Sequence, residues 1–147
     1  WYEKFPVILV WSGNSGTHTS SYIDSKKWGS KITSAGNNSM QKISRIEWDL
    51  SSWELILEES LNFCNNSGLI REENRMKLLK EIDNAIIDTE FKNQVVVRLC
   101  MLGESAIILP KKCTDSKNDL MVQISNYLMH TNLDYTVCDV SQSPLLL

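Results

Sequence analysis

The stretch VVVRLCML, Val95–Leu102, decides the fold that the sequence predicts. It is apolar at every position except Arg98, which is typical of a central strand that is covered on both faces. We therefore expect it to form the middle of a sheet, with Arg98 reaching a partner such as Asp49 or the open end of the sheet. Residues 103–105 (GES) follow, so that the next apolar run, 106–109, forms either a hairpin with the first or the end of one kinked strand.

Three further segments are predicted to be strands. Pro6–Trp11 is a short apolar run that begins with proline and is followed by serine and glycine. Ile43–Leu50 alternates between apolar and charged residues, which is the period of a half-buried strand. Tyr135–Val140 makes the last strand. Residues 18–35 are ambiguous and predict a short, weak helix at most, because Gly29 lies among them.

The clearest helical signals follow the second of these strands. Residues 51–54 (SSWE) match a capping box, in which a serine and a glutamate each satisfy a free backbone N–H group. This motif opens a helix that runs to about Cys64. A second helix, at about residues 72–89, forms a helical hairpin with the first, and a third is expected at 116–130. The apolar stripe of the second helix consists of Met76, Leu79, Ile82 and Ile86.

Taken as a whole, residues 1–147 are expected to form a single α/β domain, or a mixed α+β one. A central mixed sheet of about five strands would carry the helical hairpin and the further helix. Hydrophobic content of 42% and charged content of 22% exclude a wholly disordered chain. Because the chain begins at Trp1 and ends in three leucines, we expect a domain excised from a longer, multidomain chain.

The cysteines predict free thiols in a reducing compartment. They show neither a CxxC pair nor a zinc-type spacing with the two histidines. We therefore expect an intracellular protein, cytoplasmic or nuclear. Two glycosylation sequons, which begin at Asn37 and Asn65, keep a secreted protein as the alternative. The four cysteines are Cys64, Cys100, Cys113 and Cys138.

The stretch SGNSG, residues 12–16, is the best candidate for a ligand-binding loop. Glycines let the backbone approach a phosphate, and amide groups at a helix N-terminus carry partial positive charge. In a Rossmann-like, methyltransferase-like domain, Gly13, Ser15 and Gly16 would bind a nucleotide or S-adenosylmethionine, and Asp49 would accept a hydrogen bond from the ribose. The spacing matches neither GxGxxG nor the P-loop motif, so that an ordinary turn is the alternative.

Positive charge is concentrated in one part of the chain. Residues 18–45 hold five basic residues and one acidic residue, whereas residues 47–90 hold eleven acidic and four basic ones. A basic segment that contains an aromatic residue is the minimum for gripping single-stranded nucleic acid or a stacked base. The alternative is a solvated surface with the tryptophan packed inward. The candidate nucleic-acid-binding residues are Lys26, Lys27, Trp28 and Lys31.

No motif specifies a reaction or a cofactor, so the first expectation for function is a non-catalytic α/β interaction domain of a larger protein. Such a domain acts through protein-protein contacts, in which some of the five tryptophans would be interface anchors. Binding of a nucleotide or S-adenosylmethionine and binding of nucleic acid are the two alternatives. A net charge of −3 gives no overall attraction to nucleic acid or to an anionic membrane, and no apolar run approaches the length of a membrane span.

Overall fold

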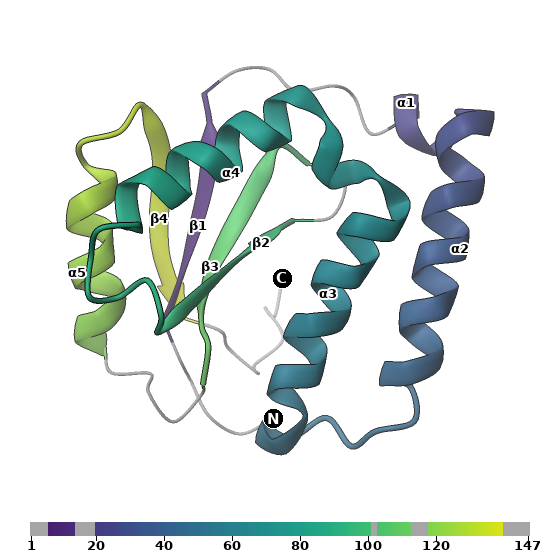
Figure 1. Cartoon of the computed structure of the whole chain (residues 1–147), viewed down its shortest axis with the longest axis horizontal. Coiled ribbons are helices and arrows are strands. Elements are labelled where there is room, and N and C mark those ends of the chain that lie inside the picture. The colour runs from purple at the N-terminus through teal and green to yellow at the C-terminus, as the bar shows by residue number, and fades with distance from the viewer. Residues whose placement is uncertain (1–5, 14–19, 101–102, 113–117, 140–147) are drawn as a thin grey trace, which may run out of the picture.

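A computed structural model of the chain describes residues 6–13, 20–100, 103–112 and 118–139. Its four strands are β1 (Pro6–Ser12), β2 (Val95–Leu99), β3 (Ser105–Pro110) and β4 (Leu133–Asp139). Its helices are α1 (Ser20–Ile23), α2 (Lys26–Ile43), α3 (Trp53–Ser67), α4 (Glu73–Ile86) and α5 (Asn118–Leu128), and short 3-10 turns lie at Leu50–Ser52 and Leu69–Arg71 (Figure 1).

The four described strands form one antiparallel sheet in the order β2-β3-β1-β4. The predicted mixture of helices and strands is confirmed, and β2 and β3 form the hairpin that the sequence allowed. The described sheet has four strands, all antiparallel, where a mixed sheet of about five was predicted, because residues 43–50 end α2 and lead into the 3-10 turn instead of forming a strand. A Rossmann fold has a parallel sheet, so the described sheet does not fit the Rossmann-like interpretation.

β1 and β3, rather than β2, are the inner strands of the described sheet. Ile8 and Ile108 face each other in these two strands and are fully buried. The prediction that Val95–Leu102 forms the middle of the sheet is therefore wrong, since β2 lies at one edge. β2 is apolar on both faces although it is an edge strand, because helices cover both faces of this edge. Val95 joins the core beneath α4, and Val96 packs on the side of α3.

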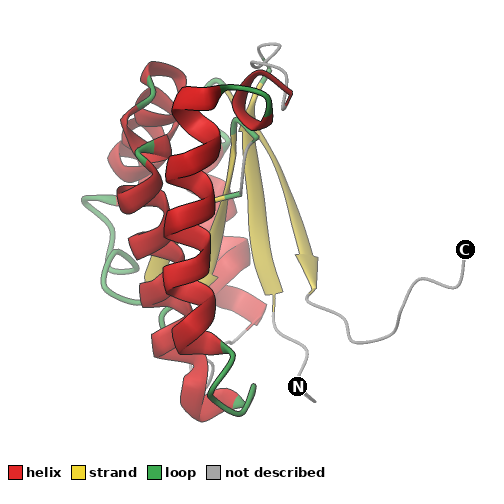
Figure 2. Ribbon diagram, turned by 90° about the vertical axis from the view of Figure 1, so that its right-hand side faces the viewer, coloured by secondary structure: helices red, strands yellow, loops and turns green. Residues whose placement is uncertain are grey.

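The helices cover the two faces of the sheet unequally. α4 and α5 pack on the face that carries Ile8 and Ile108, where they build the larger core. On the other face, Trp53 and Leu57 of α3 reach under the β2 edge, and α2 packs against the outer side of α3. Figure 2 shows that no described helix lies over the rest of this second face. The helix residues buried in the larger core include Leu78, Ile82, Ile86, Leu120, Ile124 and Leu128.

α2 is much longer than the weak helix that the sequence predicts. It begins at Ser25, whose hydroxyl accepts a hydrogen bond from the Trp28 N–H (3.4 Å), and it continues to Ile43. Ala35 and Ser39 are buried on the side that faces α3, and the Ser39 hydroxyl donates to a carbonyl of that helix. Packing of one face therefore outweighs the low helix propensity of the glycines and asparagines in this segment.

Trp53 fastens α3 to the sheet. Its indole N–H donates to the Pro110 carbonyl oxygen of β3 (2.9 Å), and only 7% of the residue is exposed. We expect Trp53→Phe to lower the free energy of unfolding by about 1–3 kcal/mol, because a buried carbonyl loses its donor and the smaller ring leaves a gap. Urea unfolding measures this loss.

The matched control for this prediction is Trp48→Phe. The Trp48 indole also donates to a backbone carbonyl, that of Ile43 (3.2 Å), but 55% of Trp48 is exposed. Water replaces a lost donor at such a site, so we expect no measurable change in the unfolding midpoint. Equal losses in the two variants would contradict the anchoring role of Trp53.

Candidate functional site

The described structure includes only part of the predicted nucleotide loop. Gly13 follows the last residue of β1, whereas Ser15 and Gly16 lie outside the described residues. A Cβ atom placed on Gly13 would lie 3.4 Å from a carboxylate oxygen of Asp134, at the start of β4. A neighbouring carboxylate repels phosphate, so the described end of this loop does not favour an anionic ligand.

Asp49, the predicted ribose acceptor, lies at the other end of the sheet. It precedes α3, which begins at the lower end of Figure 1, whereas β1 ends at the upper end. Its carboxylate accepts hydrogen bonds from the Ser51 hydroxyl (2.6 Å) and from the N–H groups of Ser51 and Ser52. These bonds, that of the Ser51 hydroxyl first, hold the pKa of Asp49 below its usual value. The structure thus does not bring Asp49 and Gly13 together.

The hydrogen bonds at the start of α3 and around Arg98 change two local predictions. The predicted capping box begins at Ser51, but the N-cap of α3 is Ser52, which makes no side-chain capping bond, and the Ser51 hydroxyl donates to Asp49. Asp49 supplies the acceptor instead. Arg98 does not need Asp49 as a partner, since its guanidinium donates to the carbonyls of Leu57 (2.9 Å) and Val97 (2.8 Å).

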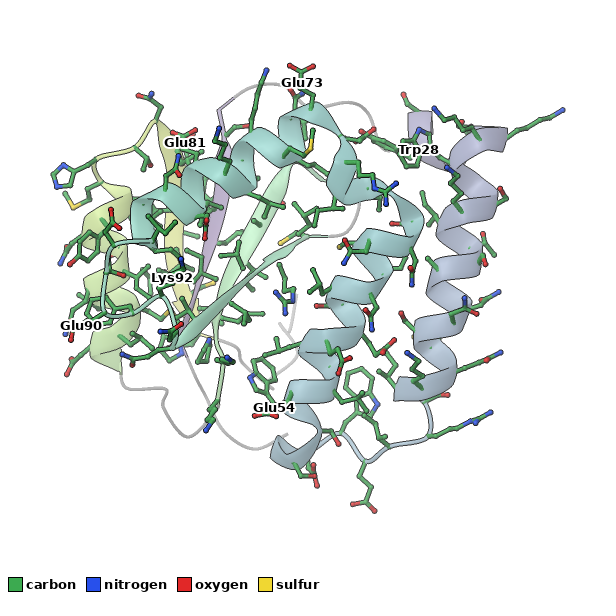
Figure 3. The ribbon with its side chains drawn as sticks, viewed as in Figure 1. Trp28, Glu54, Glu73, Glu81, Glu90 and Lys92 are labelled. Carbon is green, nitrogen blue, oxygen red and sulfur yellow. The ribbon has the colours of Figure 1, made fainter. Side chains whose placement is uncertain are left out.

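The predicted nucleic-acid residues do lie together, on the first two turns of α2. The three lysines, Lys26, Lys27 and Lys31, are exposed. Trp28, labelled in Figure 3, is half-buried, and its ring meets the ring of Tyr22 edge-on at a centroid distance of 5.8 Å. The Lys27 ammonium lies 5.8 Å from the centre of the Trp28 ring, so that both parts of the predicted site, its charge and its aromatic ring, are partly engaged within the chain.

Tyr22, whose ring contacts Trp28, belongs to a buried ionic cluster that no pattern in the sequence predicted. Arg75 of α4 is fully buried and pairs with the carboxylate of Glu72, which also accepts the Tyr22 hydroxyl (2.5 Å). The Arg75 guanidinium also donates to the Gly103 carbonyl (3.3 Å) and lies 4.8 Å from the centre of the Tyr22 ring. The cluster joins α1, the start of α4 and the β2–β3 hairpin, which indicates a structural role.

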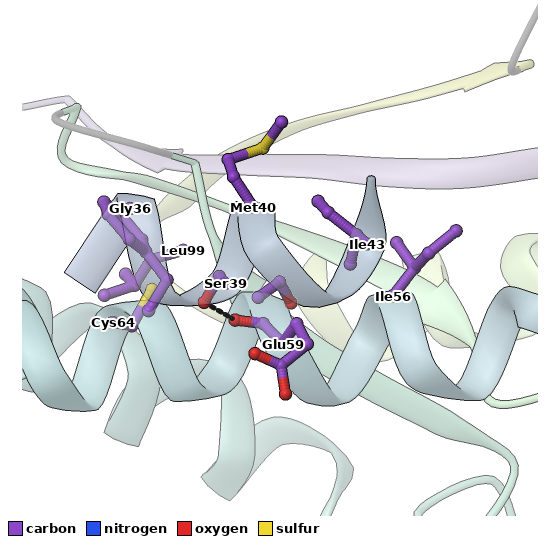
Figure 4. Close-up of a pocket in the computed structure, with 10 residues that line it drawn as sticks. Gly36, Ser39, Met40, Ile43, Ile56, Glu59, Cys64 and Leu99 are labelled. Carbon is purple, nitrogen blue, oxygen red and sulfur yellow. Dashed lines mark hydrogen bonds between the residues drawn. The ribbon is translucent and has the colours of Figure 1, made fainter. Parts of the chain in front are cut away.

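A cavity of about 360 Å³ lies between α2 and α3 (Figure 4). Its one charged lining residue, Glu59, is almost completely buried and binds the Lys42 ammonium (2.6 Å) and the Asn62 amide (2.9 Å). The bond from Lys42 is the main cause that holds the pKa of Glu59 below its ordinary value. The other lining residues are Gly36, Ser39, Met40, Ile43, Ile56, Ser60, Phe63, Cys64 and Leu99.

Glu59 makes stability depend on acid pH. Its pKa is lower in the folded chain than its ordinary value of 4.5, so its contribution is fully present above about pH 4.5 and is lost as the pH falls through the folded pKa. We expect the free energy of unfolding to fall less steeply below about pH 4.5 in Glu59→Gln than in the wild type. Urea unfolding at a series of pH values measures the two slopes. Equal slopes would contradict this role, and Glu54→Gln, an exposed position on the same helix, is the control.

β4 is the second edge of the described sheet. Its seven residues pair with β1 from Pro6↔Asp139 to Ser12↔Leu133, and no other described strand pairs with it. In an antiparallel ladder, alternate residues direct their N–H and C=O groups away from the neighbouring strand. An exposed edge of this length is a template for pairing with another chain unless it is protected.

One exposed apolar side chain lies on this strand, and two more lie on the neighbouring helix. Val137 is 41% exposed and lies on the face of the sheet on which α5 packs. Val122 of α5 (54% exposed) and Met129 (67%), which directly follows α5, are seven residues apart and share one flank of the helix. Tyr127 faces Phe91 on the opposite flank, at a ring distance of 6.3 Å. We define the β4 edge surface as Leu133–Asp139 together with Val122 and Met129.

The reverse side of β4 is also uncovered by described helices (Figure 2). Thr136 and Cys138 are exposed there, beside the half-buried Leu9 and Trp11 of β1. Among the described cysteines, Cys64, Cys100 and Cys138 are free thiols; Cys113 lies outside the described ranges. Cys138 is exposed because β4 is an edge strand of the described sheet.

Two other kinds of site have no counterpart in the described ranges. The histidines, cysteines and acidic residues of the described ranges form no group of three or more that would hold a metal ion. None of the described helices combines the length and apolar character needed to cross a membrane. Comparisons of the chain with protein-family models, with curated proteins and with solved structures find no match.

Proposed function

We propose that this chain is a non-catalytic interaction domain that binds a protein partner at the β4 edge surface. An extended segment of the partner adds to the sheet as a further strand beside β4. The observation that carries the proposal is the edge of Leu133–Asp139, with which no described strand other than β1 pairs, together with its exposed Val137; exposed Val122 and Met129 lie on and directly after α5, which packs against β4. Strand addition of this kind takes affinity from backbone hydrogen bonds and specificity from alternate side chains.

The energetics favour a composite surface of this kind. Backbone hydrogen bonds to a new strand replace bonds to water, so each contributes only about 1 kcal/mol net. Burial of one valine or methionine side chain contributes roughly 1.5–3 kcal/mol, and association costs about 4–15 kcal/mol. Toward the upper end of that cost, neither the backbone bonds nor the apolar side chains suffice alone, so that a partner gains affinity by using both.

Selection of random peptides on the intact 147-residue chain tests this proposal. Selected peptides should shift the backbone amide resonances of Leu133–Asp139 and should lose at least about tenfold in affinity for the variant Val122→Asp/Met129→Asp. Both side chains are exposed, so this variant should keep the wild-type unfolding midpoint. Selected peptides that shift other residues, such as those of the α2–α3 cavity, would overturn the proposal, as would a selection that yields no binder.

Nucleic-acid binding at the start of α2 is a second candidate function. Lys26, Lys27 and Lys31 crowd the positive end of the helix, and no acidic residue lies in its first turn. If these lysines bind phosphates, the affinity for a single-stranded oligonucleotide should fall steeply with salt, and it should fall at every salt concentration in Lys26→Ala/Lys27→Ala. Fluorescence anisotropy measures both effects. A flat response to salt would remove this candidate.

A further inference from the structure

We infer that the segment bound at the β4 edge surface has a basic residue at each end and apolar residues between them. This inference rests on the proposed function and specifies the chemistry of the partner. It follows from the charges on β4. Asp134 and Asp139 lie near the two ends of the strand, both are exposed, and β4 contains no basic residue.

The register of β4 places these charges on opposite faces of the sheet. Asp134 pairs with Trp11 and therefore faces the open side, whereas Asp139 pairs with Pro6 and faces the same side as Val137 and Tyr135. An added strand meets the two carboxylates on its two faces, so a basic residue is needed on each. Its apolar residues lie opposite Val137 and Tyr135.

These positions fix a sequence pattern for the partner. Each described strand is antiparallel to its neighbours, and antiparallel pairing is slightly more stable per residue than parallel pairing. An antiparallel partner therefore reads basic-x-apolar-x-apolar-basic, with its first basic residue opposite Asp139 and its last opposite Asp134. The two apolar side chains lie on the α5 side of the sheet. A parallel partner would have the reversed pattern.

A second copy of this chain would leave these charges unpaired. If two β4 strands paired antiparallel over their full length, Asp134 would lie opposite Cys138 and Asp139 opposite Leu133. Because β4 contains no basic residue, the second copy would bring no cation to either carboxylate, and charges on an edge strand are a common protection against self-pairing. A basic segment, unlike a second copy, pairs with both carboxylates.

The peptide Ac-SKTVTVKS-NH2 carries the inferred pattern, and Ac-SQTVTVQS-NH2 is its neutral analogue. Titrations of the intact chain, followed by the amide resonances of Leu133–Asp139, give the affinity of each. At low salt the basic peptide should bind about tenfold more tightly than the neutral one, because two opposed charge pairs form. The variant Asp134→Asn/Asp139→Asn should bind both peptides equally. The reversed basic peptide, Ac-SKVTVTKS-NH2, tests for parallel pairing.

The outcomes separate this inference from the proposed function. If both peptides shift β4 with equal affinity in the wild type, strand addition stands and the basic partner is overturned. Tighter binding of the reversed peptide would overturn the antiparallel pattern. If neither peptide shifts Leu133–Asp139, the proposed function is overturned together with the inference. If the variant Asp134→Asn/Asp139→Asn still binds the basic peptide more tightly than the neutral one, other acidic residues bind the basic peptide. That result would also overturn the inference.

The oligomeric state of the chain gives an independent check. We expect the wild-type chain to be monomeric in analytical ultracentrifugation at the concentrations of the titrations, because self-pairing of β4 leaves both carboxylates without a cation. A wild-type chain that dimerises through β4 would overturn the choice of a basic segment as the occupant.

Discussion

Replacement of Arg75 by methionine is expected to lower the free energy of unfolding by about 3 kcal/mol or more. Arg75 is fully buried, and it pairs with Glu72 and donates to the Gly103 carbonyl. Methionine fills most of the same volume but leaves the Glu72 carboxylate, which is 25% exposed, without its cation. The partial exposure of Glu72 keeps the expected loss near the lower end of the range for a broken buried ion pair. Chemical unfolding at neutral pH measures it.

Lys77→Met is the matched control for this prediction. Lys77 lies on the same helix and pairs with Glu73 (2.6 Å), but both side chains are more than two-thirds exposed. Such surface pairs contribute little, so the unfolding midpoint should not change measurably. The double variant Arg75→Met/Glu72→Gln should recover part of the stability that the single variant loses, because the uncompensated charge is then removed. Equal effects of Arg75→Met and Lys77→Met would contradict the buried cluster.

Leu78→Ala is expected to lower the free energy of unfolding by about 2–5 kcal/mol. Leu78 is 2% exposed and packs in the core between α4 and the sheet. Its removal loses the transfer free energy of the side chain and leaves a cavity that the neighbouring residues fill only in part. Met76→Ala, two residues away on the same helix, should cost about 0.5 kcal/mol or less because Met76 is 49% exposed.

This pair of variants tests the register of α4. The apolar stripe predicted from the sequence contains Met76 and Leu79, but the structure buries Leu78 and leaves Met76 exposed. The difference arises because Arg75 occupies a core position that the sequence pattern assigns to an apolar residue. A larger loss for Met76→Ala than for Leu78→Ala would restore the sequence-based register and contradict the packing described above.

Only one of the two predicted sites consists of residues that the structure brings together. Lys26, Lys27 and Lys31 are close in sequence and lie on one helix, so any helical conformation of this segment places them together. Gly13 and Asp49 are distant in sequence, and their proximity required a parallel sheet, which the described strands do not form. The β4 edge was missed, although the segment LDYTVCD carries the signal of a protected edge, an alternating strand with an acid near each end.

The sequence alone determined the local elements of this protein. Apolar periodicity and turn residues predicted β1, the hairpin of β2 and β3, the positions of α3, α4 and α5, and most of β4, because these patterns depend on residues a few positions apart. The tertiary structure decided which strand lies at an edge. The residues of β2 have the pattern of a central strand because α3 and α4 cover both of its faces, and that cover is a property of the packed chain. Strand order depends on pairs such as Val7 with Cys138, which no local pattern encodes.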